Sequence, residues 1–327
     1  MITRVLFFLS FACIGLSGCT PPASDAPSLD REKRIALTYD DAPLGAGPMF
    51  SGKERTRALI AQLDTVKTGP VAMFVTTGGF DSPGGRERVK AYADAGHLIA
   101  NHSHSHMWAG RVTAEAYIAD IDLAEKNLTG FKHRRTWYRF PYLDEGAQGR
   151  DEPDFEKRDR LRRALSARSL KNGYVTVDTY DWHLDRLWQA AVKNGEYVDM
   201  QALSKVYSDM ILDAANHYDD MAKTVLGRRP AHVLLLHEND LAARFTIDAV
   251  KALRADGWII IHPDEAFADP LADLIPETGF SGQGRLAALA ADAGLAGAEV
   301  YAHWSADKDG IESKLAEAGV FGESTLK

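Results

Sequence analysis

The chain has 327 residues, of which 45% are hydrophobic and 26% are charged, and its formal net charge is -8 at pH 7. This is the composition of a globular protein, and it excludes a largely disordered chain and a protein with many membrane spans. The excess of acidic residues disfavours nucleic acid as the main partner. The only two cysteines are Cys13 and Cys19. The rest of the chain therefore has no disulfide framework, and His, Asp or Glu must hold any metal.

The first residues have the pattern of a lipoprotein signal peptide. Arg4 precedes an apolar run from Val5 to Leu16, which is about half as long as the roughly 20 residues of a membrane-spanning helix. The run ends at Leu-Ser-Gly-Cys19, which resembles a bacterial lipobox. That resemblance implies that Cys19 carries lipid and becomes the first mature residue.

We therefore expect residues 1–18 to be removed as a signal peptide and residues 19–33 to form a flexible tether rich in Pro, Ser, Ala and Asp. The protein would then be a cell-envelope lipoprotein attached to the membrane through Cys19. Thr20, in place of an aspartate after the cysteine, favours the outer membrane facing the periplasm in a cell that has one. The alternative is an ordinary secretory signal with an incidental cysteine.

Short β-rich runs alternate with amphipathic stretches through the rest of the chain. The predicted strands span Arg34–Tyr39, Val71–Val75, Leu98–Asn101, Thr136–Phe140, Tyr174–Asp178, His232–His237 and Trp258–Ile261. The predicted crossover helices between them include Glu54–Val66, Arg86–Ala95, Thr113–Leu128 and Leu241–Asp256. Strict alternation of strand and helix predicts a parallel sheet, open or closed.

Two connections are longer than a crossover requires. They are residues 143–173 and residues 183–231, and the second contains a predicted long helix from about Asp199 to Leu226. We interpret both as insertions that form a cap or groove wall on one domain of residues 34–268. Residues 269–327 are predicted to be a C-terminal helical extension without chemistry of its own.

Polar groups that can carry chemistry follow five of the predicted strands. The first strand ends in an Asp-Asp pair, and the third runs into two histidines four residues apart, which on a helical turn would face one metal. The full set of segments is Asp40-Asp41, His102 to His106, Arg139 to Tyr142, Asp178 to Trp182, and Leu235 to His237. Each has an ordinary structural interpretation by itself, such as a solvated loop or a surface ion pair. All five, however, fall at the carboxyl ends of parallel strands, where active sites collect.

In this order the five segments resemble the motifs of the polysaccharide deacetylases, the NodB-homology group also called carbohydrate esterase family 4. The resemblance covers about Arg34 to Ala268. It implies an α/β fold, a distorted (β/α) barrel with about seven parallel strands. It also implies metal-dependent hydrolysis of an N-acetyl group, or less often an O-acetyl group, on a sugar polymer.

Carried over by motif position, the resemblance assigns roles to these residues. One divalent metal would be bound by Asp41, His102 and His106; zinc is the default, and cobalt, nickel, manganese or iron are alternatives. Asp40 would be the general base, held by Arg139.

The same resemblance makes His237 the general acid, oriented by Asp181, while Asp178 would serve the arginine or the strand end. The backbone N–H of Tyr142 would stabilise negative charge on the carbonyl oxygen. The pocket for the acetyl methyl would be lined by Leu235 and Trp182.

The first motif departs from the family pattern, because Tyr39 and Ala42 stand where the family usually has phenylalanine and glycine. Alanine does not adopt positive φ as easily as glycine, so we expect the loop that carries Asp41 to differ. Glu238, Asn239 and Asp240 have no assignment. His183, beside the fourth motif, is interpreted as a surface histidine.

The leading hypothesis is a lipid-anchored metalloenzyme that removes N-acetyl groups from an envelope or extracellular glycan, with no nucleic acid and no obligate protein partner. One alternative keeps the fold but acts on a small non-polymeric amide. Another is a non-catalytic glycan-binding or metal-binding lipoprotein. A serine hydrolase fits poorly, because no Gly-x-Ser-x-Gly elbow occurs.

Overall fold

The structure is a computed structural model that describes residues 32–148, 152–280, 282–295 and 303–324. The predicted signal peptide, Cys19 and nearly all of the predicted tether lie outside the described residues. Within the described ranges, no helix combines the length and the apolar character needed to cross a bilayer.

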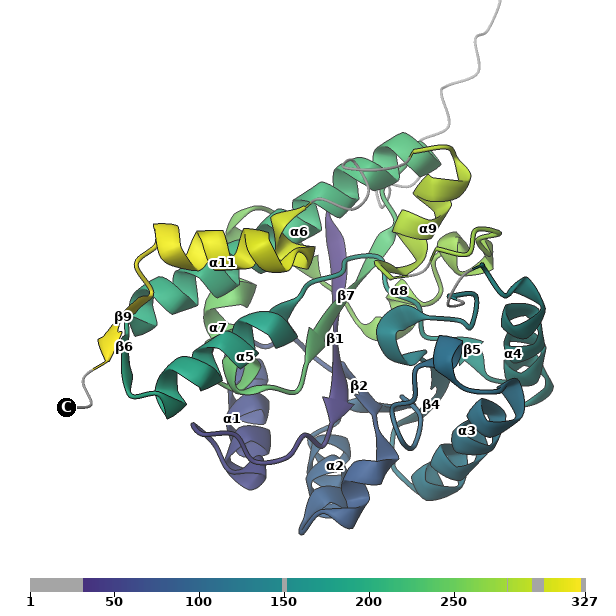
Figure 1. The fold of residues 1–327 in the computed structure, drawn as a ribbon, viewed down its shortest axis with the longest axis horizontal. Helices are drawn as coiled ribbons and strands as arrows, with labels where there is room; N and C mark the ends of the chain where they lie inside the picture. Colours follow the sequence, from purple (N-terminus) through teal and green to yellow (C-terminus); the bar gives the residue numbers. More distant parts are fainter. Residues whose placement is uncertain (1–31, 149–151, 281, 296–302, 325–327) are drawn as a thin grey trace, which may run out of the picture.

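A parallel sheet of seven strands forms the centre of the molecule (Figure 1). Its order is β5-β4-β3-β2-β1-β7, and β8 pairs with the beginning of β1. The strands are β1 (Arg34–Ala42), β2 (Ala72–Val75), β3 (Leu98–Asn101), β4 (Arg134–Tyr138), β5 (Lys171–Asn172), β7 (Ala231–His237) and β8 (Ile259–Ile260). Every residue of β2 and β3 is buried. This explains their continuously apolar sequences, because helices cover both faces of a parallel sheet.

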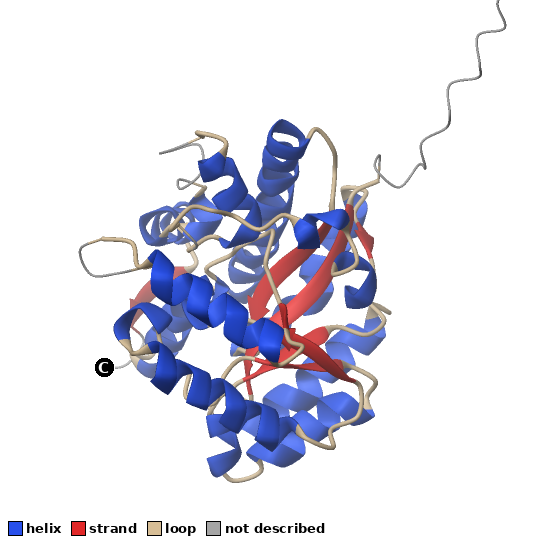
Figure 2. Cartoon of the chain, turned by 90° about the vertical axis from the view of Figure 1, so that its right-hand side faces the viewer, coloured by secondary structure: helices blue, strands red, loops and turns tan. Residues whose placement is uncertain are grey.

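Helices surround the strands (Figure 2). The longer ones are α1 (Gly52–Thr65), α2 (Gly85–Asp94), α3 (Ala114–Leu128), α4 (Phe155–Ala167), α5 (Asp181–Lys193), α6 (Met200–Leu226), α7 (Asp240–Ala255), α9 (Gly284–Asp292) and α11 (Lys308–Glu317). Their starts carry the expected capping residues: Ser51 forms a capping box with Glu54, and Thr113 and Asn239 accept backbone hydrogen bonds at α3 and α7. The main core lies between the sheet and α1, α5, α6 and α7.

The prediction of a fifth strand at Tyr174–Asp178 was wrong, because this segment is not a regular strand. β5 lies earlier, beside β4, and Val177 makes only an isolated parallel bridge with Leu234. Gly173 N donates to Tyr138 O of β4 at 2.7 Å, whereas Val177 N donates to Val233 O of β7 at 3.0 Å. The segment crosses from one edge of the curled sheet to the other, so it cannot pair regularly with either. The sheet and its surrounding helices form a curled half-barrel, which confirms the predicted distorted (β/α) barrel.

The second long connection, residues 183–231, contacts the C-terminal part of the chain. The predicted long helix is confirmed as α6, with Asp199 as its N-cap. β6 (Glu196–Val198) pairs antiparallel with β9 (Phe321–Ser324), and α11 contacts both α5 and α6. The C-terminal extension is therefore not only helical. Its residues Ile311, Leu315 and Val320 are buried in the main core.

Candidate active site

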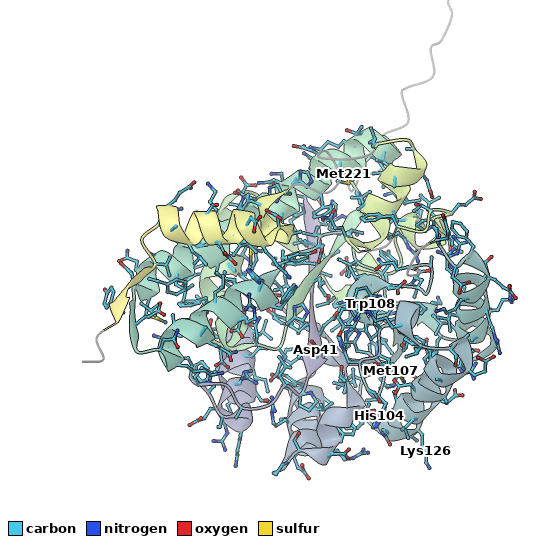
Figure 3. All side chains as sticks on the ribbon, in the orientation of Figure 1. Asp41, His104, Met107, Trp108, Lys126 and Met221 are labelled. Atoms are coloured by element: carbon cyan, nitrogen blue, oxygen red, sulfur yellow. The ribbon has the colours of Figure 1, made fainter. Side chains whose placement is uncertain are left out.

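A cavity of about 440 Å³ opens at the carboxyl ends of β1, β3 and β7. Figure 3 labels two side chains of its wall, Asp41 and Trp108, near the centre of the molecule. The cavity is lined by Asp40, Asp41, His102, His106, Trp108, Phe140, Tyr142, Leu143, Gln148, Asp178, Tyr180, Trp182, Leu235, His237 and Gly282. All predicted site residues line it except Arg139 and Asp181, which contact Asp40 and His237 from behind.

Asp41, His102 and His106 have the geometry of a metal site. One potential ligand atom from each lies within 4.8 Å of the other two. Asp41 Oδ1 is 3.2 Å from His106 Nε2 and 3.6 Å from His102 Nε2. Ligands at about 2.0 Å from a tetrahedral zinc lie about 3.3 Å from one another, so these spacings fit such an ion. Two imidazoles and one carboxylate would leave coordination positions open for water and substrate.

The environment of His102 prepares it to bind a metal. Its Nδ1 donates to Arg139 O at 2.9 Å, which leaves the lone pair of Nε2 directed at Asp41. Burial, together with the nearby His106, lowers the pKa of His102 to about 3, so the imidazole is neutral. A neutral imidazole is the form that coordinates a metal.

The backbone of this site differs from expectation in two ways. The two histidines do not lie on a helical turn: the loop after β3 folds back at Ser103, at φ 74°, whose Oγ accepts a hydrogen bond from His106 N. In the first motif, the positive φ of 67° belongs to Asp41 rather than to Ala42. The alanine is therefore unstrained, and its replacement of glycine does not displace the Asp41 ligand.

Asp40 and Arg139 form a buried pair beside the three predicted metal ligands. Asp40 Oδ1 accepts from Arg139 Nη1 at 2.6 Å, while Oδ2 lies 3.6 Å from His102 Nε2. Arg139 is fixed by further bonds to Thr38 Oγ1 and Gly173 O, and its guanidinium lies 3.7 Å from the centre of the Phe74 ring. Burial raises the pKa of Asp40, although Arg139 and His237 oppose the shift. A carboxylate with a raised pKa is a stronger base.

His237 is paired with Asp181 across the cavity floor. His237 Nδ1 lies 2.6 Å from Asp181 Oδ1, and Asp181 Oδ2 accepts from His237 N and from Asn239 Nδ2. Burial disfavours the charged imidazole, but the Asp181 carboxylate outweighs it, and the pKa of His237 is raised to about 10. His237 is also the register partner of Asp40 on the neighbouring strand. The predicted acid and base thus face the same cavity.

Asp178 is a buried carboxyl group in the wall of the cavity. No hydrogen bond joins it to Arg139 in the described part of the chain, and its buried Oδ2 has no partner there. Burial is the main cause that raises its pKa to about 8. Asp178 is therefore largely protonated at neutral pH.

Four aromatic side chains line the cavity in two pairs. Tyr142 is 51% exposed and stacks on Trp108, with ring centres 5.0 Å apart. Trp182 is 37% exposed and packs beside Tyr180. The sequence analysis did not single out Trp108 or Tyr180. Position was the available signal, because Trp108 lies two residues after His106 and Tyr180 lies within the segment Asp178 to Trp182.

The C-terminal extension contacts the turn that carries the fourth motif, which the sequence analysis did not anticipate. Tyr180 N donates to Ser305 O at 2.7 Å, and Lys308 Nζ lies 5.4 Å from the centre of the Trp182 ring. His183 was expected at the surface, but its side chain is buried, with Nε2 3.1 Å from Glu312 Oε1. Tyr180, Trp182 and His183 are therefore contacted by a segment that lies more than 100 residues away in the sequence.

A family model matches part of the chain. Residues 29–152 match the family model described as polysaccharide deacetylase, and this segment contains the metal triad, Asp40 and Arg139. No curated protein sequence matches the chain.

Several solved structures are similar in fold. A family 4 carbohydrate esterase from Streptomyces lividans, in complex with acetate, is 20% identical with a TM-score of 0.43 over 72% of this chain and 95% of that one. A chitin deacetylase from the fungal pathogen Colletotrichum lindemuthianum is 16% identical with a TM-score of 0.45, over 73% and 89%. A peptidoglycan deacetylase from Bacillus subtilis is 21% identical with a TM-score of 0.40, over 70% and 87%. Residues 29–152 thus match a polysaccharide deacetylase family model, and the motif residues within this segment and after it meet on one cavity.

Proposed function

We propose that the domain is a metal-dependent deacetylase that removes N-acetyl groups from a polysaccharide of the cell envelope. The observation that carries this proposal is the meeting of three groups on one cavity: the Asp41, His102 and His106 triad, the Asp40–Arg139 pair and the Asp181–His237 pair. A protein that only binds glycan or metal has no need of the two hydrogen-bonded acid and base pairs.

The metal ligands are Asp41, His102 and His106. When bound, a divalent ion would polarise the acetamide carbonyl and lower the pKa of water. Zinc suits this ligand set, and cobalt, nickel, manganese or iron can occupy similar sites.

The remaining chemistry belongs to side chains of this chain. Asp40 takes the proton of the attacking water through Oδ2, because Oδ1 is engaged by Arg139. The backbone N–H of Tyr142 donates to the carbonyl oxygen as negative charge develops there. His237 gives a proton from Nε2 to the leaving amine, since its Nδ1 is held by Asp181. Leu235 and Trp182 contact the acetyl methyl group.

Replacing Asp40 with Asn tests this mechanism. The amide cannot accept the proton, so acetate release should fall by about 10²–10⁴-fold, the usual contribution of a general base. Metal content, measured on the same preparation, should stay close to that of the wild type, because Asp40 is not one of the three ligands. Unchanged turnover in Asp40→Asn would refute the mechanism.

The substrate class is tested by comparing acetate release from chitin oligomers, peptidoglycan and small acetamides. The rings of Tyr142 and Trp182 line the cavity and stay partly exposed, which favours a polymer that extends past the reacting sugar. Turnover of the small acetamides alone would instead support the small-amide alternative.

The location of the enzyme at the envelope is supported by the pattern of the first 19 residues. Lipid on Cys19 would attach the protein to the membrane, and a glycan of the envelope would then lie within reach. Cys19→Ala should release the protein from the membrane fraction of the cell. An unchanged distribution would favour the ordinary secretory signal.

A further inference from the structure

Two buried ion pairs lie behind the metal site, outside the lining of the cavity. Arg88 Nη2 binds both carboxylate oxygens of Glu238, at 2.8 and 2.9 Å. Arg55 binds Asp240 through Nε at 2.7 Å and through Nη2 at 2.6 Å. The side chains of both carboxylates are fully buried, and those of the two arginines are at most 8% exposed. Glu238 and Asp240 are two of the residues that had no assignment from the motifs.

Both pairs also bind the loop of residues 43–51, which joins β1 to α1 and is called here the β1–α1 loop. Leu44 N donates to Glu238 Oε2 at 2.9 Å, and Leu44 O accepts from both arginines, at 2.5 Å from Arg88 and 3.1 Å from Arg55. Arg55 additionally donates to Gly45 O at 2.6 Å. The backbone of the loop is thus fixed three residues after the metal ligand Asp41.

The loop approaches the second ion pair so closely that only glycine fits there. A Cβ atom on Gly47 would lie 2.3 Å from Asp240 Oδ2 and 2.9 Å from Arg55 Nη2. A side chain at this position would have to push the loop away from the pair, so the contact requires this residue.

The network connects the two strand ends that carry the chemistry. Glu238 directly follows His237, and the β1–α1 loop follows Asp41, whose backbone is held at φ 67°. A non-glycine residue persists in this conformation only where its surroundings determine it. Buried ion pairs add little net stability compared with apolar residues of the same volume, so stability alone does not explain four buried charges here.

We propose that Glu238 and Asp240, with Arg88 and Arg55, are positioning residues that hold the β1–α1 loop and thereby keep Asp41 in the geometry that binds the metal. The inference rests on the metal site of the proposed function. It concerns binding of the ion, however, and not turnover.

The test measures zinc affinity of metal-stripped protein by competition with a chromophoric chelator. Glu238→Gln and Gly47→Ala should each raise the Kd for zinc on the order of tenfold, as loss of supporting contacts around a metal site does. Arg88→Met combined with Glu238→Leu leaves no unpaired buried charge at this pair, so the protein should fold. This double variant should also bind zinc more weakly, because Leu44 loses its partners.

Arg228→Met provides the matched control. Arg228 Nη2 pairs with the buried Asp269 at 2.6 Å, and Asp269 anchors Ala231 at the opposite end of β7. This variant also loses an arginine that pairs with a buried carboxylate, yet its Kd for zinc should stay within about twofold of the wild type.

Zinc affinity within twofold of the wild type in folded Glu238→Gln and Gly47→Ala would overturn the inference, and so would an equal loss in Arg228→Met. The proposed function fails separately. Wild-type protein that binds zinc but releases no acetate would refute the deacetylase and leave the positioning role standing.

Discussion

At the scale of single residues, two adjacent aspartates do different work because their backbones differ. Successive side chains of a strand point to opposite faces, so a regular strand could not bring both into one cavity. The left-handed φ of Asp41 turns its carboxylate back beside Asp40. Asp40 is buried against Arg139, whereas Asp41 faces the two histidines. The motif letters identify both residues, but only the backbone separates the proposed base from the proposed ligand.

The pairing of His237 with Asp181 predicts a pH effect. The raised pKa keeps His237 protonated and able to act as an acid up to about pH 10. In Asp181→Asn the opposing charge is lost while burial remains, so the pKa of His237 should fall. The alkaline limb of kcat should then move to lower pH by at least about one unit, in a pH–rate profile. A profile identical to the wild type would show that another group supplies the proton.

The raised pKa of Asp178, about 8, predicts a stability effect with a defined sign. An ordinary aspartate has a pKa of about 3.9, so between roughly pH 4 and pH 8 the folded state binds more protons than the unfolded state, and stability falls as pH rises. Asp178→Asn removes the titrating carboxyl group, so this loss of stability with rising pH should not occur. The variant should melt at a higher temperature than the wild type at pH 8, and the difference should shrink toward pH 4. Equal melting temperatures at pH 8 would contradict the assignment.

At the scale of elements, the start of α7 serves both the fold and the site. Asn239 Oδ1 caps the helix by accepting from Ala242 N at 2.8 Å, and its Nδ2 donates to Asp181 at 3.0 Å. The helix end that follows the catalytic strand therefore also orients the carboxylate that holds His237.

Two substitutions separate these roles. Asn239→Ser keeps a capping oxygen but loses the donor to Asp181, so stability should change little while kcat decreases. Asn239→Ala loses both the capping oxygen and the donor to Asp181. Its kcat should decrease as well, and its unfolding free energy should fall by about 1 kcal/mol. Denaturant melts and steady-state kinetics on the two variants measure the difference. Equal kcat in Asn239→Ser and wild type would show that the donor to Asp181 is dispensable.

The C-terminal segment shows how an element outside the matched domain contributes to the site. α11 is anchored in the main core through Ile311 and Leu315, and from there it reaches the turn that bears Trp182. No catalytic motif marks this segment in the sequence, because its residues act through contacts with the turn. Only their positions in the folded chain give them a role.

At the scale of the whole molecule, the metal would join parts of the barrel that are separate in sequence. Its ligands come from the end of β1 and from the loop after β3, with β2 between these strands. An ion that binds only the folded state stabilises it in proportion to its affinity.

Zinc at 100 times its Kd should therefore increase the unfolding free energy by about 2.7 kcal/mol, and a chelator should remove both this increment and the activity. Thermal melts with and without zinc measure the effect. Asp41→Asn should abolish the increment, whereas Asp40→Asn should retain most of it. An increment that survives Asp41→Asn would mean that zinc binds elsewhere.

Much of the fold could be predicted from the sequence, because the relevant signals are local. Apolar runs indicated six of the seven strands of the sheet, and amphipathic periodicity indicated α1, α2, α3, α6 and α7. The exception, Tyr174–Asp178, has the composition of a strand. It crosses between β4 and β7, however, and that geometry depends on where both edges lie.

The amino-acid sequence alone indicates which residues can do the chemistry: three histidines, four aspartates and an arginine, placed at or near strand ends. The tertiary structure decided how they act. The turn of Asp41, the protonated state of Asp178, the network around Glu238 and the support from α11 all arise where residues distant in sequence meet. Burial and electrostatic interactions depend on those distances in space, and no local pattern of residues specifies them.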